Sequence, residues 1–429
     1  MRTSLTRWGI LVSFASALAI AAIPDTLVFR ETGAMEMTES NLATPPRGFP
    51  AREFEARCAL AQERMALAGH AALLVMTEPE VRYFTGFLTP FWQSPTRPWF
   101  VVIPRTGKPV AVIPAIGAEC MTRTWIDDIR TWSSPNPADE GVSLLAETLR
   151  DLINTDGTIG IPMGPETVLR MSFNDFNRLA EIMAPIRFTD ASPIIRHLRM
   201  HKSEAEIDKI RHICGVMSGV FETLPEILST GMSDIDIFRC FKIAALNAGA
   251  DDVAYLVGGT GAGGYGDIIS PPSSRPSVTG DVLILDTGAT FDGYFCDFDR
   301  NYMFGDTTDA AKRAHDVVYQ ATEAGLAAAR PGNTCSDLFH AMQRVMDAGG
   351  AMGNDVGRLG HGLGMQLTEW PSNTPTDDTV LEPGMVMTLE PGMTFAEGKV
   401  MVHEENIVIR DGAPELLSRR APATMPIIL

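Results

Sequence analysis

The sequence predicts an α/β (α+β) protein of two or three domains. The chain has 429 residues, which is more than one typical domain holds. Over its first half, apolar residues alternate between helical spacing and short continuous runs, a pattern typical of helices packed on a sheet. Its second half contains two β-rich runs joined by Asp292 and Gly293, which is a strong hairpin signal.

The composition is that of a globular protein with an excess of acid. Hydrophobic residues make up 45% of the chain and charged residues 21%, and the formal net charge is -18. A nucleic-acid or anionic-membrane partner would need a basic surface, so we expect neither. Some of the acidic residues are instead expected to hold cations. The six cysteines form no CxxC pair and indicate free thiols.

The first 46 residues are predicted to be a leader or disordered arm. Arg2 and Arg7 precede an apolar run at residues 9–23 that ends in small residues, which is the layout of a secretory signal peptide. The run is too short to span a membrane comfortably. A leader that is not part of the folded protein is the other interpretation. We expect a cytoplasmic protein, with export as the alternative if residues 1–35 are a true signal peptide.

Residues 47–195 are predicted to form an α/β domain. Apolar residues recur at helical spacing over 54–68, and the apolar run 71–76 indicates a buried strand. Two further strands are expected at 101–103 and 110–113, because each is a short apolar run beside a turn signal that contains glycine.

A second domain is predicted over residues 196–429. Residues 191–204, which contain Pro193 and a charged stretch, are interpreted as a connector. Ser203 and Glu206 then have the spacing of a capping box at the start of a long helix.

A weak internal repeat divides this second domain. Residues 228–236 resemble residues 330–338, because each segment has a glycine turn, a Ser or Thr N-cap and an acidic first helical turn. Two such segments predict two matching half-domains with a cleft between them.

The hairpin carries the first two candidate ligands. Asp286 and Asp297 lie on opposite arms, and a turn at Asp292 and Gly293 sets them nearly opposite each other. Two carboxylates at that range repel each other and desolvate poorly unless a cation lies between them. The alternative interpretation, a solvated surface position, is disfavoured for Asp286 because this residue follows the buried apolar run 283–285.

Three further candidates follow along the chain. His361 lies between glycines that allow a close backbone approach, Glu390 ends an apolar strand, and Glu404 lies inside a β-rich run. Four carboxylates and one imidazole suit two hard or borderline divalent cations bridged by water. Such a pair lowers the pKa of the water and stabilises a tetrahedral intermediate. Mn, Fe, Co and Zn all remain open.

These segments resemble the metal motifs of peptidase family M24, the family of methionine aminopeptidase, aminopeptidase P, prolidase and creatinase. The motifs are Asp286-x-Gly288, Asp297-x-x-Arg300, Gly360-His361-Gly-x-Gly364, Glu390-Pro-Gly392 and Glu404-x-x-Ile-Val-Ile. In the first domain, Tyr83-x-Thr85-Gly86 resembles the creatinase-type N-terminal domain. The resemblance covers about residues 47–412. It implies a creatinase-like N-terminal domain, a pita-bread C-terminal catalytic domain and a dimer or tetramer, of which we expect the homodimer.

The resemblance also implies roles for individual residues. Asp286 would bind one metal ion and His361 and Glu390 the other. Asp297 and Glu404 would bridge the two ions, and Glu390 would also handle the proton of the metal-bound water. The family's last acid lies three residues before an Ile-Val-Ile run, and this spacing selects Glu404 over its neighbour Glu405.

Two departures from the family pattern concern histidines that hold the substrate carbonyl or carry a proton to the leaving amine. Peptidases of this class have one before the first metal aspartate, but residues 258–272 contain none. They have another seven residues after the His-Gly histidine, where this chain has Thr368. The glycine-rich loop 258–266 is expected to line the substrate pocket.

The remaining candidate substrate-binding residues are a tyrosine, an aspartate and two tryptophans. Together with Thr368 they would shape a pocket for a compact or cationic substrate, and the tryptophans offer cation–π contacts. For the tryptophans, packing at a domain or subunit interface is the other interpretation. The four residues are Tyr265, Asp267, Trp92 and Trp99.

The expected function is metal-dependent hydrolysis of an amide or peptide C–N bond, Xaa-Pro peptidase-like, through water activated by two metals. The alternative is a non-peptidase member of the family that acts on a small metabolite, like ectoine hydrolases or dimethylsulfoniopropionate lyases. The lyase branch has Asp-x-Asp at the first metal position, whereas this chain has Asp286-Thr287-Gly288. Intact ligands argue against both a metal-free hydrolase and a non-enzymatic binding module.

Overall fold

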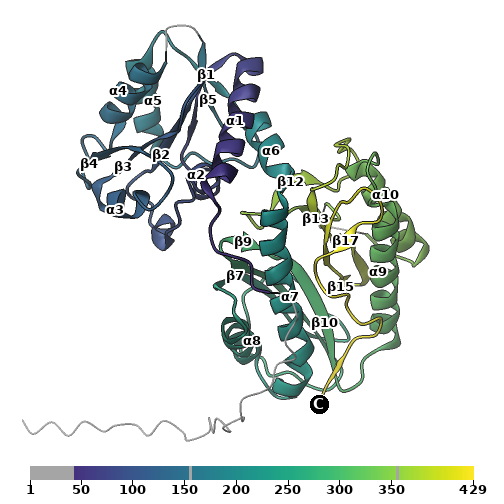
Figure 1. The fold of residues 1–429 in the computed structure, drawn as a ribbon. Helices are drawn as coiled ribbons and strands as arrows, with labels where there is room; N and C mark the ends of the chain where they lie inside the picture. The colour runs from purple at the N-terminus through teal and green to yellow at the C-terminus, as the bar shows by residue number, and fades with distance from the viewer. Residues whose placement is uncertain (1–42, 154–156, 354–356) are drawn as a thin grey trace, which may run out of the picture. The chain divides into compact units, whose positions relative to one another are not determined.

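The computed structural model describes residues 43–153, 157–353 and 357–429 (Figure 1). The predicted signal peptide at residues 1–35 lies outside the described residues. The first half of the chain contains, in order, α1 (Ala51–Ala68), β1 (His70–Val75), α2 (Glu78–Thr85), η1 (Pro90–Gln93), β2 (Phe100–Pro104), β3 (Val110–Pro114), η2 (Ala115–Gly117), α3 (Ala118–Met121), β4 (Asp128–Trp132), α4 (Val142–Leu152), β5 (Thr158–Ile161), α5 (Phe173–Met183), β6 (Phe188–Asp190) and α6 (Ser192–Met200).

These N-terminal elements form one mixed sheet with helices on both faces. The strand order is β4-β3-β2-β1-β5-β6, and β1, β2 and β3 pair antiparallel. Successive residues of these strands face opposite layers: Leu74 and Val102 pack against α4 and α5, whereas Leu73 and Val101 pack against α1 and α6. Both faces are buried, which is why the strands are continuous apolar runs. The predicted helix and three strands are confirmed as α1, β1, β2 and β3.

The segment interpreted as a connector is largely helical. Residues Ser192–Met200 form α6, which begins with Pro193 in its first turn, where proline needs no hydrogen-bond donor. Ile195 and Leu198 anchor the helix in the core. The proposed domain division at residues 195 and 196 therefore falls inside α6. The capping box of Ser203 and Glu206 at the start of the next helix is confirmed.

The described residues of the second half contain two five-stranded sheets, the two-stranded sheet β14-β15 and two helix pairs. Its elements are α7 (Glu204–Ile227), α8 (Asp234–Ala248), β7 (Asp252–Ala262), β8 (Asp281–Phe291), β9 (Tyr294–Phe295), β10 (Phe298–Phe304), α9 (Asp309–Ala328), α10 (Cys335–Ala348), β11 (His361–Gly362), β12 (Glu369–Ser372), β13 (Val386–Leu389), β14 (Gly392–Ala396), β15 (Lys399–Val402), β16 (Glu405–Val408), β17 (Glu415–Leu416) and β18 (Ile427–Ile428).

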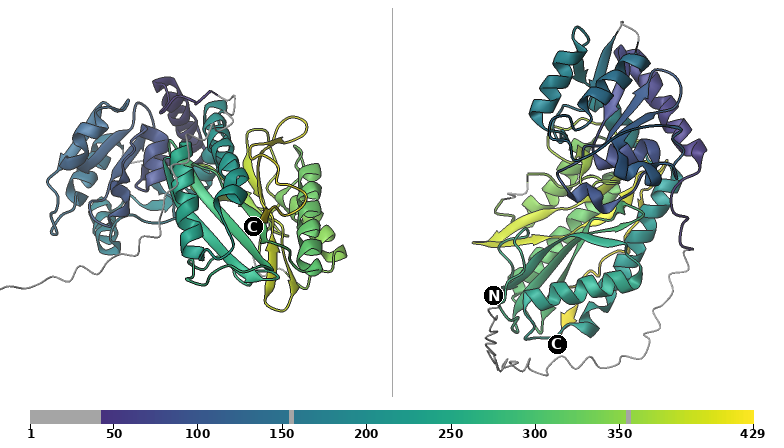
Figure 2. Two further views of the ribbon diagram at one scale, coloured as in Figure 1. Left: turned by 90° about the horizontal axis from the view of Figure 1, so that it is seen from below. Right: turned by 90° about the vertical axis from the view of Figure 1, so that its left-hand side faces the viewer.

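The two helix pairs correspond to the internal repeat. Helices α7 and α8 pack on the sheet ordered β18-β10-β8-β7, whereas α9 and α10 pack beside the sheet ordered β12-β11-β13-β16-β17 (Figure 2). The predicted N-caps are confirmed, because Ser233 and Thr334 each accept a hydrogen bond from the backbone three residues on. Each capped helix follows a long helix, as the repeat predicts.

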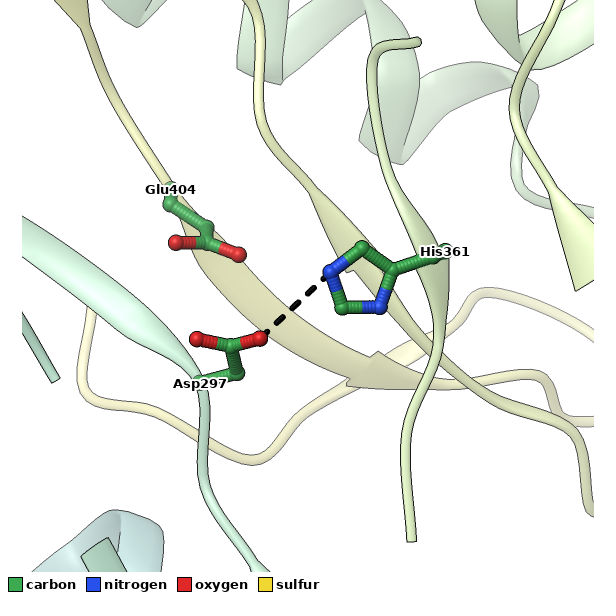
Figure 3. Close-up of side chains that lie close together, drawn as sticks. All are labelled: Asp297, His361 and Glu404. Atoms are coloured by element: carbon green, nitrogen blue, oxygen red, sulfur yellow. Dashed lines mark ion pairs between the residues drawn. The ribbon is translucent and has the colours of Figure 1, made fainter. Parts of the chain in front are cut away.

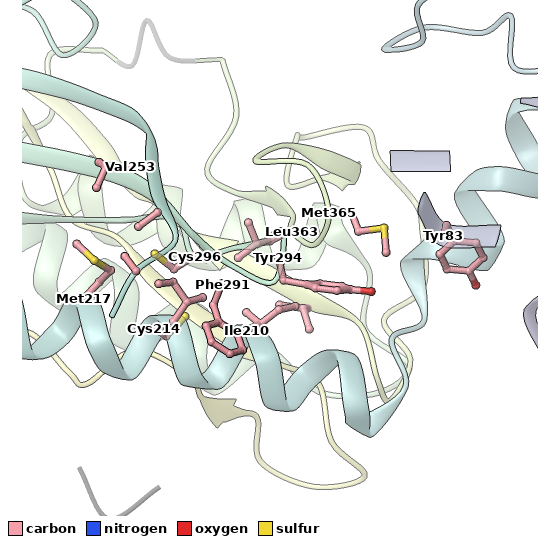
Figure 4. Close-up of a cluster of buried hydrophobic side chains, with 14 of the residues drawn as sticks. Tyr83, Ile210, Cys214, Met217, Val253, Phe291, Tyr294, Cys296, Leu363 and Met365 are labelled. Atoms are coloured by element: carbon pink, nitrogen blue, oxygen red, sulfur yellow. The ribbon is translucent and has the colours of Figure 1, made fainter. Parts of the chain in front are cut away.

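Packing of α7 against the hairpin holds the first two candidate ligands in place. Figure 4 shows Ile210, Cys214 and Met217 of this helix beside Phe291 and Cys296 of the hairpin. All six cysteines are free, as predicted. Within the part of the chain that the structure describes, no helix is both long and apolar enough to cross a bilayer.

Candidate metal centre

The hairpin geometry places three aspartates on one face of its sheet. Asp292 and Gly293 have φ of 46° and 66°, as a two-residue type I′ turn requires. In the resulting register Asp286 pairs with Asp299, and Asp297 lies two residues nearer the turn. Asp286 and Asp297 are therefore diagonal neighbours, and the acid directly opposite Asp286 is one that sequence reasoning did not select.

The other three predicted ligands lie at strand ends or breaks. His361 begins β11, Glu390 follows β13, and Glu404 lies in the gap between β15 and β16. The backbone of His361 donates to Thr388 Oγ1 at 3.0 Å. This close approach requires Gly360, because a Cβ there would lie 2.2 Å from the carbonyl oxygen of Thr388. Position 360, before the histidine, therefore requires glycine for a steric reason.

Three of the five predicted ligands form a tight cluster (Figure 3). Ligand atoms of Asp297, His361 and Glu404 lie within 4.8 Å of one another. His361 Nε2 is 3.4 Å from Asp297 Oδ2 and 3.8 Å from Glu390 Oε1. His361 Nδ1 lies 2.9 Å from the carbonyl oxygen of Gly362 and must donate to it. The Nε2 lone pair therefore faces the carboxylates, as in a metal ligand.

Two carboxylate oxygens of the cluster lack a hydrogen-bond donor from the protein and are suited to bind divalent cations. Asp286 Oδ1 and Glu404 Oε1 are buried, and no described residue donates a hydrogen bond to either. Buried carboxylate oxygens without a partner are costly. Four carboxylates and one imidazole make a donor set suited to Mn, Fe, Co or Zn. The residues present therefore fit the predicted cations.

Burial has opposite effects on the acids and on the histidine. It raises the pKa of Asp286 to about 7 and that of Glu390 to about 8. The pKa values of Asp297 and Glu404 are also raised well above normal, by burial and then by the neighbouring carboxylates. Burial, with Arg358, lowers the pKa of His361 to about 4 and keeps the imidazole neutral. A bound cation would favour the ionised acids instead.

Glu404 and Glu405 occupy different environments. Glu404 joins the cluster, whereas Glu405 accepts hydrogen bonds from Arg300 and Arg420, both at 3.0 Å, and from the Ala421 backbone at 2.8 Å. The carboxylate of Glu405 is therefore compensated by the protein itself, and only Glu404 is free to act as a ligand.

Two of the predicted substrate-binding residues line a cavity of about 760 Å³. Thr368 and Trp92 contribute to it, together with Phe295 and Leu367. Thr368 Oγ1 accepts a hydrogen bond from Arg358 Nη2 at 3.3 Å. The Arg358 Nε atom also lies 3.7 Å from Glu390 Oε1, so this arginine connects the cluster to the cavity wall.

The other predicted pocket residues lie elsewhere. Trp99 is 2% exposed and packs against Phe87 in the N-terminal core. Tyr265 is equally buried, and its hydroxyl donates to Asn301 Oδ1 at 2.9 Å. Asp267 is exposed and accepts hydrogen bonds from the backbone of its own loop, for example from Ile269 at 2.7 Å. The pocket interpretation of these three is corrected, because core packing or local turns use their side chains.

The glycine-rich segment that was predicted to be a loop is partly a strand. Its first five residues, 258–262, continue strand β7 opposite β8, because Gly258 approaches the Ile284 carbonyl too closely for a side chain. Three site residues were missed: Asp299, Arg358 and Tyr255, which hydrogen-bonds Asp286. Counting residues outward from a two-residue turn at 292 and 293 predicts that Asp299 pairs with Asp286. The other two contacts come from tertiary packing and leave no local signal.

Comparison with known proteins agrees with this geometry. Residues 208–411 match the model of metallopeptidase family M24, and residues 57–201 match the creatinase/prolidase N-terminal domain. The chain belongs to metallopeptidase family M24. Membership confirms the predicted family and makes the protein a hydrolase.

The M24 chain resembles curated relatives over most of its length. It is 28% identical over 383 residues to the probable dipeptidase PepE of Mycobacterium tuberculosis, covering 86% of this chain and 95% of that one. It is 25% identical to the putative dipeptidase YkvY of Bacillus subtilis, covering 81% and 94%.

Solved structures confirm the predicted fold class. Dipeptidase PepE from Mycobacterium ulcerans superposes with a TM-score of 0.77 at 23% identity, covering 89% of this chain and 99% of that one. Recombinant prolidase from Thermococcus sibiricus superposes with a TM-score of 0.78 at 24% identity, covering 87% and 99%. At these identities the likeness concerns the fold alone.

Proposed function

We propose that this M24 protein is a dipeptidase-like hydrolase that uses two divalent cations to cleave the C–N bond of a compact substrate, with Xaa-Pro dipeptides as the first candidates. The observation that carries the proposal is the buried cluster of Asp297, His361 and Glu404 with Glu390 beside it, together with the buried oxygens of Asp286 and Glu404 that have no protein donor among the described residues. Relatives named as dipeptidases and a prolidase support the same reaction class.

The five side chains have distinct proposed roles. Asp286 would hold one cation and His361 and Glu390 the other, and Asp297 and Glu404 would be shared between the two. A divalent cation supplies Lewis acidity, which polarises a carbonyl and makes a water more acidic. The chain's own contribution is to orient His361 Nε2 toward the carboxylates through the bond of Nδ1 to Gly362, and to bury the side chains of Asp297 and Glu404.

Glu390 is the proposed proton carrier. Its carboxylate faces both His361 and Arg358, at 3.8 Å and 3.7 Å, and it lies at the end of a strand rather than inside one. Burial favours its protonated form, whereas Arg358 favours the ionised form. A carboxylate balanced in this way can accept a proton and return it to a leaving amine.

The cavity that contains Thr368 and Trp92 is the proposed substrate site. Its volume of about 760 Å³ lies within the range of small-molecule pockets, so it accommodates a dipeptide without a long chain. Arg358 is hydrogen-bonded to Thr368 and presents a cationic donor where the family pattern has a histidine. It is the proposed contact for the substrate's carbonyl or carboxylate.

One observation favours a second candidate function. Thr368 cannot carry a proton as a histidine does, so hydrolysis of a small metabolite amide with a better leaving group is the alternative. The same cations and the same proton carrier would serve both substrates.

The test combines metal analysis with a substrate panel. Wild type is expected to hold about two divalent ions per chain after loading with Mn or Fe, and Asp297→Ala and His361→Ala are expected to hold fewer. Asp267→Ala, which changes an exposed aspartate, is the matched control. Equal metal content in all four proteins would refute the site.

The substrate panel contains Xaa-Pro dipeptides, other dipeptides and small N-acyl metabolites, with amine release as the measurement. Turnover of dipeptides by wild type and not by Asp297→Ala supports the proposal. Turnover of N-acyl metabolites alone would replace it with the second candidate. The predicted homodimer is checked on the same samples by light scattering.

A further inference from the structure

A fifth acidic side chain lies beside the metal cluster. Asp299 lies on β10 directly opposite Asp286 on β8. Side chains of directly opposite residues project from the same face of a sheet, with Cβ atoms about 4.5–5.5 Å apart. Asp297 is two residues away on the same chain segment and so shares this face. Three aspartates therefore converge on one side of the hairpin.

The Asp299 carboxylate is buried without compensation. The residue is 2% exposed, and no described residue donates a hydrogen bond to its Oδ1. Among the charged groups that act on its carboxyl, Asp286, Arg300, Glu405 and Glu390 have the largest effects. Three of these four are acids.

The one cation among these neighbours is engaged elsewhere. Arg300 Nη1 donates to the main-chain oxygens of Asp299 and Glu404, and its Nη2 donates to Glu405 Oε2 at 3.0 Å. The guanidinium therefore contacts the backbone of Asp299 and not its carboxylate. An uncompensated buried charge is strongly destabilising, so this position needs a cation that the chain itself does not supply.

We infer that Asp299 is a sixth protein ligand of the metal pair and coordinates the same cation as Asp286. The inference rests on the two-cation site proposed above and deepens it. The cation at Asp286 would then have oxygen donors from three aspartates, two of them facing each other across the hairpin. Because oxygen-rich sites suit hard cations, this position is selective for Mn²⁺ or Mg²⁺ over Zn²⁺.

The decisive variant is Asp299→Asn, which keeps the shape and removes the charge. Its matched control is Asp234→Asn, which makes the same change at another buried aspartate, one that Thr260 Oγ1 and Ser273 Oγ satisfy at 2.8 and 2.7 Å. Mn²⁺ binding to metal-depleted protein is measured by calorimetry. Electron paramagnetic resonance then reports whether the bound ions form a spin-coupled pair.

Wild type and Asp234→Asn are expected to bind two Mn²⁺ ions with equal affinities. Asp299→Asn is expected to lose at least tenfold in affinity at one of its two sites and to lose the coupled-pair spectrum at limiting Mn²⁺. Without metal, Asp299→Asn is expected to melt at a higher temperature than wild type, because an uncompensated charge is gone, and Asp234→Asn at a lower one. A purely structural aspartate would give the opposite shift for Asp299→Asn.

Two outcomes would overturn the inference. One is wild-type affinity at both sites of Asp299→Asn, and the other is an equal loss at both sites. If Asp299→Asn does not fold, Asp299→Ala repeats the binding measurement with a smaller side chain. If wild type itself binds fewer than two ions, the two-cation proposal fails. If wild type binds two ions and Asp299→Asn is unchanged, only the role of Asp299 fails.

Discussion

Two clusters of buried acids in this protein differ in the partners that the chain provides. Glu369 accepts from Arg199 at 2.6 Å and from Lys202 at 3.0 Å, and all three side chains are buried. In the metal centre, Asp286 and Glu404 each have a buried carboxylate oxygen to which no described residue donates.

The pKa values of the two clusters move in opposite directions. Burial alone would raise the pKa of Glu369, but Arg199 and Lys202 outweigh it and hold that pKa at about 2. Burial raises the pKa of Asp286 to about 7. Residue type and burial are therefore insufficient to separate a structural acid from a metal ligand. The presence of a protein cation within hydrogen-bonding distance separates them.

The largest expected effect tests the uncompensated cluster. Asp297→Asn removes the proposed bridging charge, so kcat/KM for the best substrate of the panel is expected to fall by more than the roughly 100-fold typical of outer-shell partners of a metal ligand. Metal content is expected to fall in parallel. Asp267→Asn is the control. Full activity in Asp297→Asn would place the metal centre elsewhere.

The compensated cluster is tested through stability. Glu369→Gln leaves Lys202 buried without its acid and leaves Arg199 with Glu80 alone, and the free energy of unfolding is expected to fall by about 3–5 kcal/mol. Urea denaturation of the metal-loaded protein measures it. Glu382→Gln, at an acid whose side chain is 57% exposed, is expected to change stability by less than about 1 kcal/mol. Similar losses in both variants would erase the distinction between the clusters.

The pH dependence of the metal-depleted protein is the next test. Asp286 and Glu390 have pKa values of about 7 and 8 in the folded chain, against ordinary values of 3.8 and 4.5. Between those limits the folded state binds more protons than the unfolded state, so stability must fall as pH rises. The melting temperature is therefore expected to decrease from pH 5 to pH 8.5 without metal.

Metal loading is expected to remove this slope, because cations replace the protons. Glu369 has no part in it, since its lowered pKa affects stability only as pH falls below about 4.5. A metal-depleted protein whose melting temperature rises across the range would contradict the assignment of uncompensated acids.

The smallest expected effect concerns the cavity wall. Thr368→His supplies the histidine that the family pattern has at this position. Turnover of Xaa-Pro dipeptides is expected to rise, but by less than the roughly 10²-fold typical of a positioned general acid, because Arg358 already contacts this site. The measurement is kcat on the dipeptide panel, with Thr368→Ala as the control. An unchanged kcat would mean that pocket shape, and not proton transfer, restricts peptide cleavage.

Local sequence patterns predicted most of the fold and the types of residue that serve as candidate metal ligands. The two-residue turn, the capping box at Ser203 and the N-caps at Ser233 and Thr334 depend on residues a few positions apart, so the sequence alone predicts them. The choice of Glu404 over Glu405 came from the resemblance to the family's motif, and it agrees with the geometry.

Tertiary structure decided which polar groups have partners. Glu369 and Arg199 are 170 residues apart, and no local pattern predicts that they meet. The same holds for Trp99 and Tyr265. Their aromatic side chains were predicted to line a pocket, but they pack in the core. Sequence alone therefore determined which side chains could bind a cation, because spacing and residue type are local. Only long-range packing decided which acids, Asp299 among them, were left without a protein cation.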